Sequence, residues 1–502
     1  MTGESAAPRR SSRVVSVHLL RATLSGLLGD GFAVALVSAR LVGDRVQISY
    51  AMVRAVDDAR VEVQINVAAG GEFPSAADLS YPLGRFEREI RDLFGVTPSG
   101  HPMPYRLVRH GHWPRGWYPM VAEPGTVPAF EDDAGEYPFT PVQGAGVYEI
   151  PVGPVHAGLI EPGHFRFSVV GETILRMKAR LWFLHRGIER LFVGRTPAQA
   201  IELTERVSGD TAVGHTLAFC LAVEEALDMP VPGNVQLVRA MLLELERVYN
   251  HLGDLGAMAN DVGFSFANSH AQRLREEMLR LNDHLTGHRL LRGGIGIGTA
   301  HASALPDRDF LRSIADQVQK LVAVTLGNRT VLDRFSGTAI LPREAAADLG
   351  TLGYVARASG IDMDARRDHP FCELPTSFAV TIENAGDALA RYRVRVGELA
   401  ISLRLLEDIT EELRVGRSVP AAGTAAARLS ARTSGLGLVE GWRGRIAHRV
   451  EFRADGTLAS VKIVDPSFLN WPALGVALAD TIVPDFPLAN KSFNQSYAGN
   501  DL

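Results

Sequence analysis

Cysteine thiols are the usual ligands of nickel and of iron–sulfur clusters. This sequence contains two cysteines, Cys220 and Cys372, which are far apart and form no CxxC pair. Two thiols cannot supply a disulfide framework, a four-cysteine zinc site or a cubane cluster. The residue types therefore argue against a thiolate-held metal centre in this chain.

Charged residues at helical spacing form a second group. Glu244 and His251 are seven residues apart, which places them on one helix face, and Arg239 and Arg247 lie close in sequence. Such a group either biases a charge relay or forms a structural ion-pair network, and the network is the favoured interpretation. The basic segment Arg366–Pro370 is expected to contact a partner or to serve the structure.

A glycine-rich run at residues 293–298 invites comparison with phosphate-binding loops. It has no Lys-Ser/Thr pair and no strand–turn–helix setting, so nucleotide binding is not expected.

Composition sets the broad class of protein. The chain has 502 residues, a net charge of −5 and 46% hydrophobic residues. This length favours two or more domains, and the charge argues against a protein that coats nucleic acid. The N-terminus has no signal-peptide pattern and no long apolar run predicts a membrane-spanning helix.

The first part of the sequence has the pattern of a small mixed domain. Residues 18–28 and 82–94 are predicted helices, and strands are expected at residues 32–37, 45–53 and 60–67. Residues 1–12 are predicted to be a flexible tail. The Pro- and Gly-rich residues after the domain are interpreted as a linker or as a strap over a partner.

The second part is mainly helical. Predicted helices cover residues 172–192, 197–207, 212–227, 235–259, 270–289, 306–327 and 387–416. Residues 165–170 have strand composition, residues 443–452 and 457–464 are an expected hairpin, and residues 484–502 are expected to be extended.

Two sets of motifs resemble known families. Phe86–Val96 with Gly100–Pro102 resembles the signature of the C-type (30-kilodalton-class) subunit of respiratory complex I. A second set resembles the D-type subunit of complex I and the large subunit of energy-converting [NiFe] hydrogenases. Its segments are Gly153–His156, Glu161–Phe165, His185–Glu189, Glu205–Arg206, Ala222–Glu224, Glu244–Arg247 and Asn250–His251. The two types joined in one chain look most like the formate hydrogenlyase large subunit.

This resemblance implies an α+β fold. A small N-terminal α/β domain of the C type is followed by a mainly α-helical D-type, hydrogenase large-subunit-like domain with β elements at both ends. The expected boundaries are residues 1–12 for the tail, 13–118 for the C-type domain, 119–148 for the strap or linker, and 149–502 for the D-type domain.

A [NiFe] site in such a family needs four thiolates in two CxxC pairs. At the corresponding positions this sequence has Ser208 and Thr211, and then Ser467 and Asn470. Hydroxyl and amide groups are poor ligands for a soft low-valent metal. We therefore expect no [NiFe] centre and no metal ligand in this chain.

The side chains with which the family binds quinone are missing as well. Gly209 stands at the position of the expected tyrosine, and Ile160 stands near the position of the expected histidine. Polar residues remain around the former cavity. The candidates for binding a small molecule or relaying protons are Asp210, Glu161, His164, His156 and His215. The alternatives are a vestigial pocket of mutually satisfied polar groups and, for Asp210, helix capping.

The resemblance implies a subunit of a membrane-bound, complex-I-related redox assembly. The cavity would be rebuilt either for another electron acceptor, which could be a quinone, or for proton or ion coupling. The alternative is that the chain is a non-catalytic scaffold of the same assembly. No cofactor is expected in this chain, and a proximal [4Fe-4S] cluster is expected in a small B-type iron–sulfur subunit. Other expected partners are a ferredoxin-like polyferredoxin subunit and integral H-type and antiporter-like membrane subunits. These would hold the chain at the cytoplasmic face of the membrane.

Overall fold

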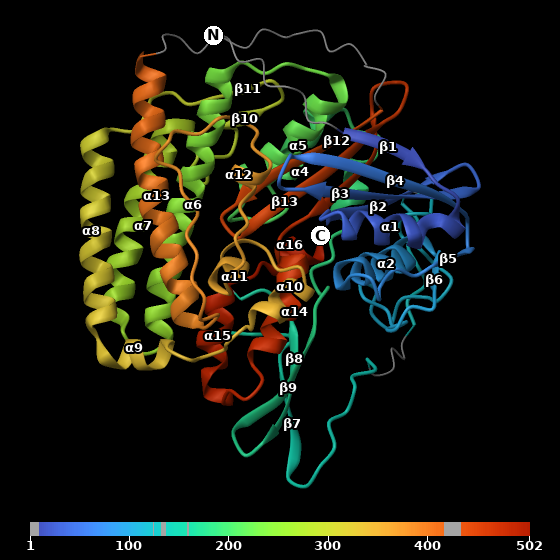
Figure 1. The fold of residues 1–502 in the computed structure, drawn as a ribbon, viewed down its shortest axis with the longest axis horizontal. Coiled ribbons are helices and arrows are strands. Elements are labelled where there is room, and N and C mark those ends of the chain that lie inside the picture. The colour runs from blue at the N-terminus through green and yellow to red at the C-terminus, as the bar shows by residue number, and fades with distance from the viewer. Residues whose placement is uncertain (1–9, 124, 132–136, 158–159, 416–432) are drawn as a thin grey trace. The chain divides into compact units, whose positions relative to one another are not determined.

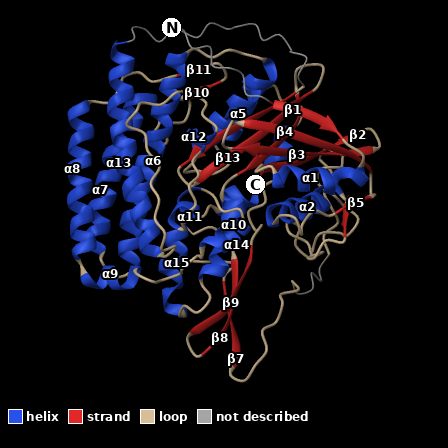
Figure 2. Ribbon diagram, in the orientation of Figure 1, coloured by secondary structure: helices blue, strands red, loops and turns tan. Residues whose placement is uncertain are grey.

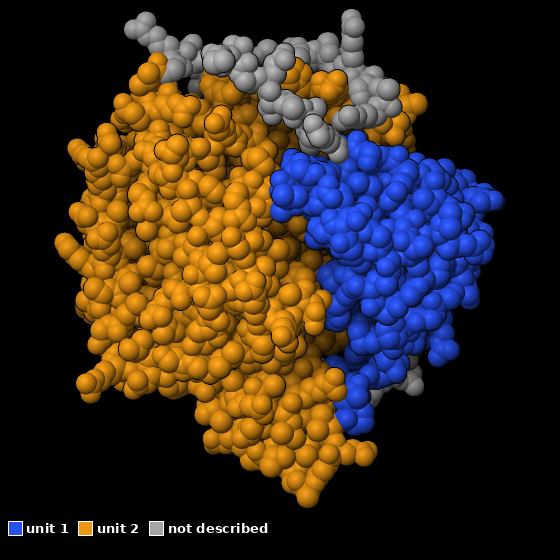
Figure 3. Space-filling view, in the orientation of Figure 1, with its two compact units in different colours: residues 1–141, 181–185, 501 blue, residues 142–180, 186–500, 502 orange. Residues whose placement is uncertain are grey.

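The structure is a computed structural model that describes residues 10–123, 125–131, 137–157, 160–415 and 433–502. The chain divides into two compact units, which Figure 3 shows in different colours. Unit 1 consists of residues 1–141, 181–185 and 501, and unit 2 of residues 142–180, 186–500 and 502.

Unit 1 is built on a four-stranded sheet in the order β1-β4-β3-β2, in which β1 pairs with β4 in parallel and the other pairs are antiparallel. The predicted helices and strands of this region are confirmed. The elements are β1 (Arg10–Val14), η1 (Val17–Leu19), α1 (Leu20–Gly29), β2 (Ala33–Val42), β3 (Arg45–Arg54), β4 (Ala59–Ala68), β5 (Glu72–Pro74), α2 (Tyr81–Phe94) and β6 (Thr97–Ser99). Of the predicted tail, residues 1–9 lie outside the described residues and residues 10–12 belong to β1.

The acidic positions of the motif at residues 86–96 anchor neighbouring loops. Glu87 accepts hydrogen bonds from the Ser75 hydroxyl (2.5 Å) and from the backbone N–H of Ala76 (2.7 Å). Asp92 accepts the backbone N–H groups of three consecutive residues, 107–109. Burial raises the pKa of Glu87 to about 7. In the predicted strap, the described residues up to residue 146 form no helix or strand.

Unit 2 combines two three-stranded sheets with many helices (Figure 2). Its elements are β7 (Val147–Val152), β8 (His164–Val170), β9 (Thr173–Arg180), α3 (Ile188–Phe192), α4 (Pro197–Thr204), α5 (Ala212–Leu227), α6 (Gly233–Asp261), α7 (Ser265–Thr286), β10 (Ile295–Gly296), β11 (Thr299–Ala300), α8 (Arg308–Gly327), α9 (Arg329–Phe335), α10 (Arg343–Asp348), α11 (Gly353–Ala358), α12 (Ala365–Asp368), α13 (Ala388–Val415), β12 (Ser434–Gly441), β13 (Gly444–Phe452), β14 (Leu458–Val464), α14 (Ser467–Ala477), η2 (Val483–Asp485), α15 (Phe486–Phe493) and α16 (Tyr497–Asp501).

The long helices α6, α7, α8 and α13 pack side by side as a bundle (Figure 1). The predictions of α4 to α8 and α13, and of the hairpin β13–β14, are confirmed. Over the described part of the chain, every helix is too short or too polar to cross a bilayer.

The prediction of a helix over residues 172–192 is wrong for most of that range. Residues 173–180 form β9, which pairs with β8 and buries Ile174 and Met177. The segment lacks strand composition, so pairing with β8 overrides its helical propensity.

The prediction that residues 484–502 are extended is also wrong. They form η2, α15 and α16, and α15 packs on α6 and α13. Leu488 and Phe493 are buried by this packing, and Pro487 occupies the first turn of α15, where a missing N–H costs nothing.

Glycines allow β12 to lie against α5. A Cβ atom on Gly437 would stand 1.9 Å from the carbonyl oxygen of Ala218, and one on Gly435 would stand 1.8 Å from that of Ala222. Real Cβ contacts do not approach this closely, so β12 and α5 approach each other only because these positions lack side chains. This contact fixes α5 against the sheet that carries the site described next.

Gly437→Ala is expected to destabilise the chain by about 3 kcal/mol or more, because the added methyl group must push apart the backbones of β12 and α5. Urea unfolding of the full chain measures this change. Gly327→Ala, at the end of α8 with no atom within 4 Å of its Cβ position, is the control. It should change stability by less than about 1 kcal/mol. Equal effects of the two substitutions would contradict the close packing.

Candidate functional site

The loop that precedes α5 is held by side chains of α6. Glu246 accepts hydrogen bonds from the backbone N–H groups of Val213 (2.7 Å) and Gly214 (3.0 Å). Asn250, one turn further along α6, donates to the backbone carbonyl of Asp210 (2.8 Å). The first N–H groups of α5, which have no partner within the helix, are thus paired from α6. Because Glu246 is fully buried, desolvation raises its pKa to about 8.

Asp210 forms a two-pronged ion pair with Arg443, which lies in the turn between β12 and β13. The two guanidinium nitrogens lie 2.8 and 2.7 Å from the two carboxylate oxygens. The Asp210 side chain is 37% exposed and that of Arg443 is 4% exposed. Desolvation on its own would raise the pKa of Asp210, but the charge of Arg443 and the hydroxyls of Ser208 and Thr211 outweigh it and lower the pKa to about 2. The carboxylate binds these groups and not the N–H groups of α5, which bind Glu246.

Three of the four positions that correspond to the family's thiolates lie in one hydrogen-bonded cluster. The Ser208 and Ser496 hydroxyls are 2.8 Å apart, and the backbone N–H of Ser496 donates to the Ser467 hydroxyl (2.9 Å). Thr211 joins this cluster through its hydrogen bond to Asp210 (2.9 Å). We call Ser208, Asp210, Thr211, Ser467 and Ser496 the serine cluster.

The fourth position, Asn470, is buried near the cluster but bonds elsewhere. Its amide oxygen accepts the backbone N–H of Leu352 (2.8 Å), and its amide nitrogen donates to the carbonyl of the same residue (3.2 Å). Asn470 therefore anchors the segment before α11.

Glu161 and His156 lie in the loop before β8, and His164 is the first residue of that strand. The hydrogen bonds named next join all three side chains to backbone groups. Glu161 accepts the backbone N–H of Ala498, at the start of α16 (3.0 Å). His156 and His164 bond to backbone carbonyls of their own loop, those of Gly163 (2.8 Å) and Gly153 (3.2 Å). Glu161 thus reaches the segment that carries Ser496, whereas the two histidines brace the loop.

His215, on α5, lies between two groups that the sequence analysis did not single out. Its Nε2 is 3.0 Å from an oxygen of Asp465, and its Nδ1 is 3.0 Å from Nε2 of His448. All three side chains are buried. Desolvation on its own would raise the pKa of Asp465, but His215, Arg443 and Ser467 together outweigh it, and the pKa is lowered overall.

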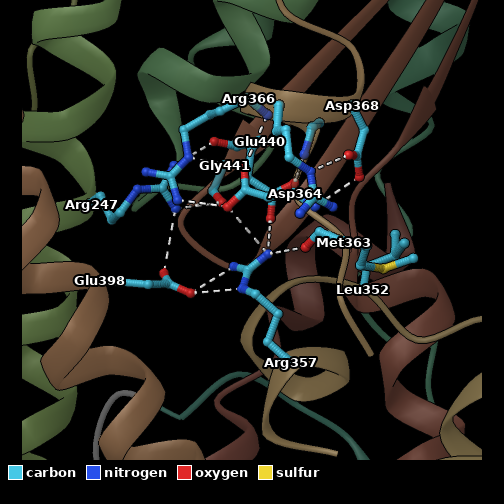
Figure 4. A network of polar contacts seen from close by, with 12 residues as sticks. Arg247, Leu352, Arg357, Met363, Asp364, Arg366, Asp368, Glu398, Glu440 and Gly441 are labelled. Carbon is cyan, nitrogen blue, oxygen red and sulfur yellow. Dashed lines mark hydrogen bonds and ion pairs between the residues drawn. The ribbon is translucent and has the colours of Figure 1, made fainter. Parts of the chain in front are cut away.

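Glu244, Arg247 and His251 lie in a buried ion-pair network, as expected. Figure 4 shows the part of this network around Arg247, Arg357 and Arg366. Arg239 does not join it and pairs with Glu224. Figure 4 shows Arg357 between Glu398 and Glu440. The closest oxygen–nitrogen pairs are Arg357–Glu398 at 2.6 Å, Arg357–Glu440 at 2.8 Å, Arg366–Asp364 at 2.7 Å, Arg366–Glu244 at 3.1 Å, Arg247–Glu244 at 3.2 Å and His251–Glu398 at 2.8 Å.

Arg366, from the basic segment that was expected to contact a partner or serve the structure, is 6% exposed and bonds inside this network. Its neighbour Arg367 lies at the surface and pairs with Asp362 and Asp368. The segment thus has one structural arginine and one surface arginine.

A [NiFe] centre does not fit the residues present. Ser208, Thr211 and Ser467 offer hydroxyl oxygens that already bond within the serine cluster, and Asn470 bonds to backbone. Hard neutral oxygen donors do not match nickel and iron sites that are built on thiolates. Within the described ranges, no group of three or more His, Cys, Asp or Glu side chains is placed to hold a metal ion.

Sequence reasoning missed the partners that complete the site, namely Glu246, Arg443, His448, Asp465 and Ser496. Asp465 carried a local signal, because it stands two residues before Ser467. Arg443 and His448 lie more than 200 residues from their partners in α5 and the loop before it, so no local pattern connects them.

Glu246→Gln is expected to flatten the pH dependence of stability. A carboxyl whose pKa is raised from 4.5 to about 8 by folding binds its proton more tightly in the folded state. The native chain therefore loses stability as pH rises through this interval, by up to roughly 1.4 kcal/mol per pH unit. Urea unfolding of the native chain and of the Glu246→Gln variant from pH 5 to 9 measures their free energies of unfolding. The difference between the two free energies should change with pH by this slope. A difference that is constant with pH would contradict the raised pKa of Glu246.

Comparisons with known proteins agree with the resemblance. Three sequence families match the chain: "Respiratory-chain NADH dehydrogenase, 30 Kd subunit" over residues 15–123, "Nickel-dependent hydrogenase" over residues 186–253, and "Respiratory-chain NADH dehydrogenase, 49 Kd subunit" over residues 261–432. Residues 416–432 of the last match lie outside the described residues.

Two relatives and one solved structure are similar over most of their length. Formate hydrogenlyase subunit 5 of Escherichia coli is 32% identical, over 88% of this chain and 78% of the relative. The membrane-bound hydrogenase subunit alpha of Pyrococcus furiosus is 28% identical, over 70% of this chain and 87% of the relative. A chain of the archaeal membrane-bound sulfane sulfur reductase has a TM-score of 0.64 at 24% identity, over 71% of this chain and 99% of its own, and supports the fold.

These matches confirm the α+β fold, with a 30-kilodalton-type unit followed by a mainly helical 49-kilodalton-type unit. The chain belongs to the complex I- and [NiFe] hydrogenase-related family of fused large subunits that includes formate hydrogenlyase subunit 5.

Proposed function

We propose that this chain is the peripheral-arm large subunit of a membrane-bound, complex-I-related redox assembly. In this proposal the serine cluster stands where relatives hold [NiFe], and it serves proton coupling and not hydrogen turnover. Family membership supports the first part, because relatives of this chain are subunits of hydrogenase and NADH–quinone oxidoreductase complexes by name.

The hydrogen bonds of Ser496 carry the second part. They join the position of the first lost thiolate pair, Ser208, to that of the second, Ser467. Hydroxyls that bond to one another are poor metal ligands but good proton carriers, because each is both donor and acceptor. This favours proton coupling over the binding of another electron acceptor between these positions.

The proton-coupling role assigns a part to Asp210. Its side chain is partly exposed, whereas Ser208, Thr211 and Ser467 are buried. Asp210 is therefore the group through which solvent protons reach the cluster, and Arg443 keeps its carboxylate ionised and in place. Glu161 accepts a hydrogen bond from the backbone N–H of Ala498, two residues after Ser496.

The proposed partners follow the family. A small B-type subunit would carry the proximal [4Fe-4S] cluster, a ferredoxin-like subunit would deliver electrons, and H-type and antiporter-like subunits would form the membrane arm. The chain itself would lie at the cytoplasmic face. Quinones are the acceptor class to test first, although Gly209 and Ile160 replace the expected quinone-binding side chains.

The second candidate is a scaffold subunit without a redox or proton step. The observation that favours it is the buried network of Figure 4, in which arginines and carboxylates from α6, α11, α12, α13 and β12 pair with one another. Such a network locks elements together without exposing a reactive group, and removal of one partner costs about 3–5 kcal/mol.

Asp210→Asn in the purified intact assembly separates the two candidates. In this experiment reduced methyl viologen reduces the iron–sulfur clusters of the assembly. If the serine cluster couples protons, the proton uptake that follows this reduction should fall at least about tenfold in the variant. The pH-indicator dye phenol red reports the uptake, and the absorbance of the iron–sulfur clusters confirms their reduction.

Asp485→Asn is the matched control, because it removes a carboxylate that, like Asp210, is partly exposed and pairs with an arginine, Arg334. It should leave proton uptake unchanged. Normal uptake by an intact Asp210→Asn assembly would favour the scaffold.

A further inference from the structure

A chain of three buried side chains runs from the edge of the serine cluster into the interior of unit 2. Asp465 follows β14, His215 lies on α5, and His448 lies on the middle strand β13. Both links are 3.0 Å, and all three residues are at most 1% exposed. The Nδ1 of His448 is buried and has no hydrogen-bond partner among the described residues.

The hydrogen-bond directions in this chain follow from the chemistry of the groups. An ionised carboxylate only accepts hydrogen bonds, so His215 must donate from Nε2 to Asp465. In a neutral imidazole the other nitrogen then accepts, and Nδ1 of His215 receives the Nε2 proton of His448. The Nδ1 of His448 is thereby left as a bare basic nitrogen inside the protein.

We propose that Asp465, His215 and His448 form a proton relay that binds one proton as the pH falls and holds it between its two ends. When Nδ1 of His448 gains the proton, its Nε2 proton moves to Nδ1 of His215, and the Nε2 proton of His215 moves to Asp465. One proton enters and the Asp465 carboxylate is neutralised, so atoms and charge balance. The same steps in reverse release the proton.

The surroundings determine which charges act on the relay. Arg443 faces Asp465 as well as Asp210, so the ion pair of the serine cluster and the Asp465 end of the relay share one cation. His215 is the group that acts on His448, whose ring also lies 6.4 Å from the ring of Phe219, edge to face. Burial lowers the pKa of His448 well below its usual value, which keeps Nδ1 unprotonated until the relay takes up a proton.

The backbone connects the relay with the serine cluster. Asp465 accepts the backbone N–H of Ser467 (2.8 Å) on the oxygen that His215 does not use. A change in the charge of Asp465 therefore acts directly on the turn that carries Ser467. The relay deepens the proposed proton-coupling function and rests on it for its biological role, but its existence is tested separately.

The first test is the ring-nitrogen NMR spectrum of the full chain labelled with ¹⁵N-histidine, assigned with single His215→Gln and His448→Gln variants. We expect both imidazoles in the Nε2–H form, with the Nδ1 signal of His448 at the position of a nitrogen free of hydrogen bonds. As pH falls, the signals of both rings should change over the same interval. The tautomers and their pH dependence are measured on the unaltered chain, and the two variants serve only to assign its signals.

The second test compares His448→Gln with the control His301→Gln, which alters an exposed histidine. Glutamine still donates a hydrogen bond to His215 but cannot pass a proton on. In His448→Gln the joint pH-dependent change of His215 should disappear, and in His301→Gln it should persist.

Three results would overturn the relay: an Nδ1–H form of His448, separate pH intervals for the two rings, or a His215 signal that is indifferent to His448→Gln. The relay and the proposed function fail separately, because the NMR spectra report the isolated chain and dye-detected proton uptake reports the assembly. Spectra as expected, combined with normal proton uptake by the Asp210→Asn assembly, would support the relay and contradict the proposed function.

Discussion

Two nearly parallel hydrogen bonds, 2.7 and 2.8 Å long, join the carboxylate of Asp210 to the guanidinium of Arg443. This ion pair connects the loop before α5 with the turn between β12 and β13. Arg443 is almost fully buried, so the cost of its desolvation is met only while the Asp210 carboxylate is in place. The hydroxyls of Ser208 and Thr211 are oriented by the same carboxylate, and the arrangement of the serine cluster depends on it.

The turn that carries Arg443 also connects this cluster with the buried network of Figure 4. Glu440, at the end of β12, pairs with Arg357, and its backbone carbonyl accepts a hydrogen bond from Arg247 (2.7 Å). Trp442 donates from its ring nitrogen to the backbone carbonyl of Asp210 (3.1 Å). A shift of this turn would therefore break buried charged contacts both in the serine cluster and in the network of Figure 4.

Much of the fold is predictable from the sequence, because long helices have a strong periodic signal. The bounds predicted for α5 are those observed, and those of α6, α8 and α13 differ by at most two residues at either end. The strand β9 was mistaken for a helix because its pairing with β8, and not its own composition, decides its conformation. The last helices were missed because α15 is stabilised by packing on α6, a contact between residues far apart in sequence.

The site was predicted in part for a similar reason. Motif positions identified Ser208, Asp210, Thr211, His215 and Ser467, which the structure brings together through hydrogen bonds to one another and to a few shared partners. Those partners, above all Arg443 and Ser496, come from the last part of the chain and have no local pattern. His156 and His164 are histidines in the expected loop, yet they bond to its backbone, because a residue type alone does not determine which way a side chain points.

The central proposal is that hydrogen-bonded oxygen groups stand in the place of the thiolates of a [NiFe] site. Nickel and iron content of the purified intact assembly, with hydrogen-dependent dye reduction on the same sample, tests it most directly. The account predicts iron from the partner subunits, no nickel and no dye reduction by hydrogen. One nickel per chain, with hydrogen-dependent dye reduction, would contradict it.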